Sequence, residues 1–176
     1  MKNSKMAMTL CLVMTTALFA QGQSTTEDLV KEWERAKAYT QEYLEAMPAD
    51  KFDFKPTDEV RSFAQQMLHI TDANYGFAAA ATGTPSPIGQ GESEKTGDTS
   101  KENVSKLVLA GYDFVLEQLK GIDAVSLDEK VKLFDRFEMT KAQALQKAFE
   151  HQTHHRGQTT MYLRMAGVKP PQEKLF

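Results

Sequence analysis

The spacing of apolar residues constrains the fold of this chain most strongly. Four separate stretches repeat apolar residues at the period of an α-helix. We expect helices over about 24–47, 60–81, 100–119 and 140–166, with Pro48, Gly121 and Gly167 ending three of them. Strand-like alternation is at most weak, near residues 130–137. The pattern therefore predicts an all-α fold, a four-helix bundle.

Helix starts and the longer connections add detail to this plan. Ser24 with Glu27, and Thr140 with Gln143, have the spacing of a capping box. Residues 82–99 are rich in glycine and proline, and we interpret them as an exposed linker; a segment that borders a functional site is the less favoured alternative. We expect residues 123–138 to be irregular or extended.

The first 22 residues have the three-part pattern of a secretory signal peptide. Lys2 and Lys5 precede an apolar run of about 14 residues, and Ala20 and Gly22 supply small residues for cleavage. That run is shorter than the ~20 residues of a membrane-spanning helix, so an uncleaved anchor is the less favoured alternative. We expect a signal peptide at 1–22, one domain at 23–176, no stable membrane span after processing, and export to the periplasm or the extracellular space.

Composition excludes several kinds of function. The formal net charge of -3 gives no reason to expect a nucleic-acid partner, whose phosphates demand a basic face. The chain has 1 cysteine, Cys11, which lies inside the apolar run. The processed protein would therefore have no disulfide and no cysteine ligand or nucleophile.

The histidines carry the strongest chemical signal. His151 and His155 are four residues apart, so they project from one helix face, whereas His154 points about 100° away and is excluded from the pair. His69 lies within the second expected helix, and small or polar residues surround its face and that of His155. If the second and fourth helices are neighbours, these three imidazoles can meet.

Three imidazoles suit one divalent transition metal, such as Zn, Ni, Fe, Mn or Cu, and leave a position open for water or substrate. The spacing alone is also compatible with a surface or packing pair. Further candidates are Gln65 and Asp72 as groups that orient His69, Glu150 and Asp72 for proton transfer, and Gln65 and Tyr162 as pocket residues. Each of these side chains has an ordinary solvated or core position as its alternative.

Two segments resemble the DinB family, also called the DinB/YfiT-like metalloenzyme superfamily. They are FAQQMLHI at 63–70 and HQTHHRGQ at 151–158, the latter followed by MYLRMAG at 161–167. The resemblance extends over about 25–171 and implies a four-helix bundle whose metal is held by His69, His151 and His155. It also implies a possible homodimer. The signal peptide departs from the many relatives that resemble cytoplasmic proteins.

The leading functional expectation is a metal-dependent hydrolase that acts on a small-molecule substrate. The resemblance also allows a thiol-cofactor-dependent S-transferase, but an exported protein meets fewer cytosolic thiols. A different class stays open, in which the ion fastens two helices together in a metal-binding or interaction module without catalysis.

Overall fold

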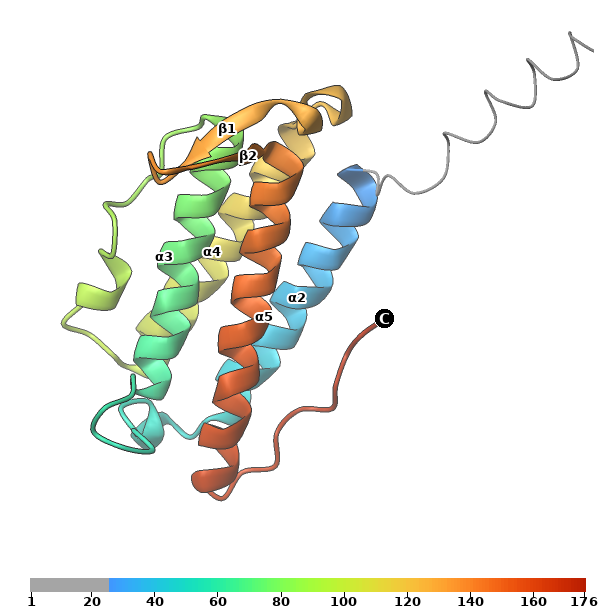
Figure 1. The fold of residues 1–176 in the computed structure, drawn as a ribbon. Helices are drawn as coiled ribbons and strands as arrows, with labels where there is room; N and C mark the ends of the chain where they lie inside the picture. The colour runs from blue at the N-terminus through green and yellow to red at the C-terminus, as the bar shows by residue number, and fades with distance from the viewer. Residues whose placement is uncertain (1–25) are drawn as a thin grey trace, which may run out of the picture.

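The computed structural model describes residues 26–176, and most of these residues form four long helices that pack side by side (Figure 1). The helices are α2 (Thr26–Ala46), α3 (Phe63–Thr82), α4 (Lys101–Gly121) and α5 (Lys141–Met165). The predicted all-α four-helix bundle is therefore confirmed. The expected signal peptide and the capping residue Ser24 lie outside the described residues.

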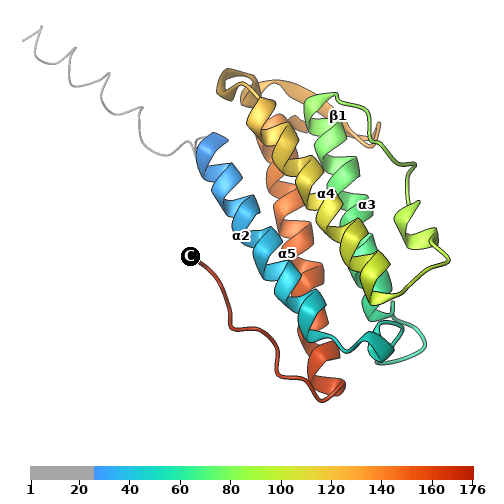
Figure 2. The same ribbon diagram turned by 180° about the vertical axis from the view of Figure 1, so that it is seen from behind.

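The helices are not arranged in chain order. α3 packs against α4 and α5, and α2 packs against the same two helices, so the order around the bundle is α2, α4, α3, α5. The connection between α2 and α3 crosses one end of the bundle and contains the short helix η2 (Ala49–Lys51), as the two opposite views show (Figures 1 and 2). α3 and α5 are neighbours, which is the condition that the three histidines required.

Local hydrogen bonds fix where α3 and α5 begin and end. α3 begins at Phe63 rather than near Val60, because Ser62 caps it and forms a capping box with Gln65. Thr140 and Gln143 form the predicted capping box at the start of α5. Gly167 follows α5 with a φ of 78°, a left-handed conformation that favours glycine.

A small antiparallel hairpin occupies part of the segment that we expected to be irregular or extended. The short helix η4 (Ala124–Asp128) leads into β1 (Lys130–Leu133), which pairs with β2 (Phe137–Thr140) in the register Lys130 to Thr140. Phe134 and Asp135 form the turn with φ values of 52° and 56°. This hairpin ends directly in α5 and lies over the end of α3 (Figure 1).

The bundle interior is mainly apolar, with one polar chain passing through it. Trp33 is fully buried and packs edge-on against Tyr112 and Phe149. The Tyr112 hydroxyl bonds Thr40 of α2 at 2.8 Å and donates to Gln152 of α5 at 2.9 Å, so one side chain of α4 joins two other helices. No helix within residues 26–176 is long and apolar enough to cross a membrane.

Candidate metal centre

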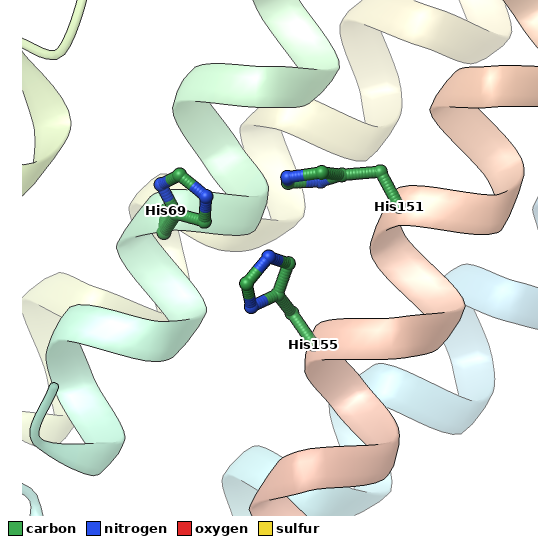
Figure 3. Close-up of side chains that lie close together, drawn as sticks. All are labelled: His69, His151 and His155. Carbon is green, nitrogen blue, oxygen red and sulfur yellow. The ribbon is translucent and has the colours of Figure 1, made fainter. Parts of the chain in front are cut away.

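Three histidine side chains converge between α3 and α5 (Figure 3). His69 comes from α3, while His151 and His155 lie one turn apart on α5. Each can offer one ring nitrogen such that all three nitrogens lie within 4.8 Å of one another. The ring centroids are 4.4 to 5.0 Å apart. A single ion can therefore contact all three imidazoles.

Hydrogen bonds orient two of the rings toward this common point. His69 Nδ1 lies 2.6 Å from Glu94 Oε1, and His155 Nδ1 lies 2.8 Å from Gln66 Oε1. Carboxylate and amide oxygens only accept, so both Nδ1 atoms must carry the proton. The Nε2 lone pairs of His69 and His155 are then available to a metal, as in other sites where an outer hydrogen bond fixes the tautomer.

His151 completes the site in a different way. Its Nδ1 is buried and has no hydrogen-bond partner within residues 26–176. Burial, followed by the charges of His69 and His154, lowers the pKa of His151 to about 4. Burial and the neighbouring histidines lower the pKa of His155 to about 4 as well. Neutral imidazoles and an unpaired buried nitrogen are what a divalent transition metal needs, so these residues fit such an ion.

The connection between α3 and α4 contributes directly to this site. Its short helix η3 (Ser93–Lys95) brings Glu94 to His69, and Arg61 binds the other carboxylate oxygen at 2.9 Å. Burial alone would raise the pKa of Glu94, but the hydrogen bonds and charges of Arg61 and His69 lower it below its ordinary value. Our interpretation of residues 82–99 as a mere linker is therefore wrong, because this segment supplies an anion that orients a metal-site imidazole.

Asp72 holds this connection against α3. Its two carboxylate oxygens accept the backbone N–H groups of Ser93 and Glu94 at 2.9 and 3.0 Å. Asp72 thus acts on His69 through the position of Glu94, without an interaction of its own with the imidazole. Both oxygens of the Asp72 carboxylate are therefore used to hold the connection between α3 and α4.

Tyr162 is buried and supports the other oriented ring. Its hydroxyl donates to the backbone oxygen of Arg61 at 2.7 Å and lies 3.4 Å from Gln66 Nε2, while Gln66 Oε1 contacts His155. Tyr162 therefore lies behind the histidine group, and it does not line the cavity in front of it.

The remaining predicted residues lie away from the convergence point. Gln65 is used in the cap of α3, and its side chain accepts from the Ser62 backbone N–H. Glu150 is exposed and pairs with Lys147. His154 is exposed, contacts Gln158, and does not belong to the group of three. Its exclusion from the pair on helical geometry agrees with this arrangement.

A cavity of about 610 Å³ opens beside two of the histidines. His69 and His151 form part of its wall, and Phe77, Ile88 and Phe134 supply much of the apolar surface. Phe134 packs on Phe77 with ring centroids 5.2 Å apart. The cavity therefore combines a short polar region at the imidazoles with a larger apolar region, as small-molecule sites commonly do.

Sequence reasoning gave no function to several residues that build this site and its cavity. Glu94 lies in a segment without periodicity, and no local pattern places it against a histidine 25 positions earlier. Gln66 lies in α3, yet the imidazole that its side chain contacts, that of His155, belongs to another helix. Phe134 reaches the cavity through the hairpin turn, which the weak alternation near 130–137 only suggested.

The fold and this site define a class of protein, an all-α bundle with a three-histidine group between its second and fourth helices. A model of the DinB family matches residues 21–175. The chain is also 30% identical over 131 residues to Uncharacterized protein YjoA of Bacillus subtilis (strain 168), with 73% of this chain and 82% of that protein covered. The chain belongs to the DinB family.

Solved structures show the same fold. A DinB-like protein from Bacillus cereus ATCC 10987 matches with a TM-score of 0.73 and 22% identity, covering 85% of this chain and 98% of that one. YfiT from Bacillus subtilis matches with a TM-score of 0.64 and 16% identity, covering 84% and 91%. YfiT is described as a probable metal-dependent hydrolase with an unusual four-helix bundle topology.

Proposed function

We propose that the protein is a divalent-metal-dependent hydrolase whose ion is held by His69, His151 and His155. The observation that supports this proposal most directly is the convergence of three imidazoles. In two of them a hydrogen bond at Nδ1 leaves the Nε2 lone pair available to a metal. Within residues 26–176 the group includes no fourth histidine, cysteine or carboxylate. A three-ligand shell is typical of catalytic sites, whereas structural sites usually have four protein ligands.

The proposed hydrolysis depends on the three-histidine group and on the cavity beside it. When bound, a divalent ion supplies a Lewis acid that makes water a stronger nucleophile near neutral pH. Phe77 and Phe134 give the cavity an apolar wall that can hold the body of a substrate and exclude bulk water. Glu94 and Gln66 keep the two oriented imidazoles in place during turnover.

A proton carrier is also available in the cavity wall. Asp72 and Glu94 are occupied by hydrogen bonds, while the Asp135 carboxylate has no hydrogen bond or ion pair within residues 26–176. Asp135 is thus better placed for proton exchange than Glu150, whose carboxylate pairs with Lys147 on the surface. Asp135→Asn should lower kcat while leaving metal content unchanged.

Hydrolysis is favoured over the two other functions considered. The description of YfiT supports a metal-dependent hydrolase on this fold. The signal-peptide pattern of residues 1–22 supports export, which separates the protein from cytosolic thiol cofactors. The cavity beside the histidines favours catalysis over an ion that only fastens helices together.

The test is a substrate screen on protein of known metal content. Esters, amides and phosphoesters are offered to the native protein, to chelator-treated protein and to treated protein reloaded with zinc, nickel, manganese or iron. We expect hydrolysis that chelator removes and one of these metals restores. Chelator-insensitive hydrolysis would exclude a metal-dependent mechanism. Stoichiometric metal without turnover of any substrate class would instead favour the non-catalytic module.

A further inference from the structure

A second cavity, of about 520 Å³, is lined by residues of α2, α5 and the C-terminal segment that follows α5. This segment runs back along the bundle beside α2 (Figures 1 and 2). The lining residues of the second cavity include none of those that line the cavity at the histidines. Five cationic side chains but a single carboxylate side chain, that of Glu173, contribute to its wall. The five are Arg35, Arg156, Arg164, Lys169 and Lys174.

Arg156 is the most unusual of these cations because it is only 5% exposed. Its Nη1 donates to Gln152 Oε1 at 2.7 Å and lies 3.4 Å from Thr40 Oγ1 and from the Ala36 carbonyl. Its guanidinium carbon lies 4.6 Å from the centre of the Tyr39 ring. All of these contacts are neutral groups, and within residues 26–176 no carboxylate pairs with Arg156. A buried charge without an opposite charge is costly, so an anion in the adjoining cavity would be stabilising.

The other cations differ in whether their charge is already balanced. Arg35 pairs with Glu32 and also donates to the Lys174 carbonyl, and Lys174 pairs with Glu42. These contacts hold the C-terminal segment against α2. Arg164 and Lys169 have no ion pair within residues 26–176 and are exposed at the cavity rim. Three cations, the third being Arg156, and the Glu173 carboxylate therefore have no ion pair within residues 26–176, which leaves an excess of two positive charges at this cavity.

The rest of the wall suits an organic molecule. Phe149 and the rings of Tyr39 and Tyr43 provide apolar surface, and Thr160 and Tyr43 provide hydroxyls that bond each other at 2.7 Å. An excess of two positive charges matches a doubly negative group better than a single carboxylate, and the planar fork of an arginine matches phosphate oxygens. We propose that this cavity binds a small phosphate-bearing molecule with an apolar body, at a site separate from the histidine group.

The test uses benzylphosphonate, which carries the charge and the ring but has no phosphoester bond to hydrolyse. Binding to the metal-containing protein is measured by isothermal titration calorimetry in slightly alkaline buffer. Benzoate and benzyl alcohol serve as singly charged and neutral probes of similar size. We expect saturable binding of benzylphosphonate, at least tenfold weaker binding of benzoate, and no measurable binding of benzyl alcohol.

Variants locate the binding. The double variant Arg164→Gln with Lys169→Gln alters only exposed side chains, so it should fold, and it should weaken benzylphosphonate binding at least tenfold. The double variant Lys106→Gln with Lys132→Gln, at exposed residues outside the cavity, is the charge-matched control and should bind normally. Arg156→Lys keeps the charge without the fork and should also bind more weakly, with thermal unfolding used to check that it is folded.

Three results would overturn the site itself, and a fourth would overturn the charge of its ligand. The first is no saturable binding to the native protein. The second is equal binding by the double variant and the native protein. The third is loss of binding in His155→Ala, which would place the phosphonate on the metal. Equal affinity for benzoate would overturn the assignment of a doubly charged group.

Discussion

α5 presents two faces of opposite electrostatic character. The face toward α3 carries His151 and His155, whose pKa values are lowered to about 4, so it is uncharged at neutral pH and suited to a cation. The face toward α2 carries Arg156, a buried charge suited to an anion. The adjacent residues His155 and Arg156 thus serve opposite chemistries, because a helix turns each successive side chain by about 100°. The comparison shows that helical phase, more than nearness in sequence, decides the function of a residue here.

The largest effect is expected on metal content, when a histidine of the α5 face toward α3 is removed. His155→Ala removes one of three ligands and should abolish stoichiometric metal, measured by elemental analysis of the purified protein. His154→Ala is the matched control, because His154 is the adjacent residue but lies outside the group, and it should retain full metal content. Full metal content in His155→Ala would contradict the assignment of the three ligands.

The second effect concerns the residues behind the ligands. Glu94→Gln removes the carboxylate that accepts from His69, and metal affinity should fall about 10–100-fold with the ligands themselves intact. Glu92→Gln, in the same connection, should change affinity little, since the Glu92 carboxylate accepts from the Gly89 backbone N–H and, within residues 26–176, has no contact with the histidines. Competition with a chelator of known affinity measures both variants. Equal affinities would show that Glu94 only fastens the connection.

The pH dependence of stability should further distinguish the histidine face of α5 from the Arg156 face. In metal-free protein, the folded pKa values of His151 and His155 are about 4, below the ordinary histidine value of 6.5. Below 6.5 the unfolded state takes up protons more readily, so stability falls as the pH drops toward 4. Thermal unfolding of metal-free protein should show this fall. A variant with His151→Gln and His155→Gln should show a shallower one, and identical pH profiles would contradict the lowered pKa values.

The smallest effect is expected on the free energy of unfolding, when the buried hydrogen bonds of Tyr112 with Thr40 and Gln152 are removed. Tyr112→Phe removes a buried hydroxyl that bonds both Thr40 and Gln152, and should lower the free energy of unfolding by about 1–3 kcal/mol. Tyr75→Phe is the control, because no hydrogen bond of the Tyr75 hydroxyl is found within residues 26–176 and its loss should cost less. Denaturant titration measures both, and metal content should stay unchanged. An equal loss of unfolding free energy in the two variants would show that the hydrogen bonds of Tyr112 do not contribute to stability.

The sequence predicted the features that depend on local chemistry. Helical spacing located the four helices, and the Thr140 and Gln143 pair located the start of α5. The juxtaposition of His69 with the α5 histidines could only be stated as a condition, because it depends on which helices are neighbours. Glu94 was beyond prediction, since its position depends on Asp72 holding a connection with no periodic pattern. No local pattern predicts that Arg156 lacks a carboxylate partner within residues 26–176, because this is a property of the packed bundle.

The order of helices around the bundle has a consequence for how the protein is made. A ribosome releases α2, α3 and α4 first, and α4 can already pack against both of the others. The gap between α2 and α3 stays open until α5, the last helix, closes it. Gln66 and His155 meet across 89 positions of the chain, so the complete histidine group exists only after this final closure. Only completely folded molecules would then bind the metal. An ion could stabilise the completed bundle without guiding its early assembly.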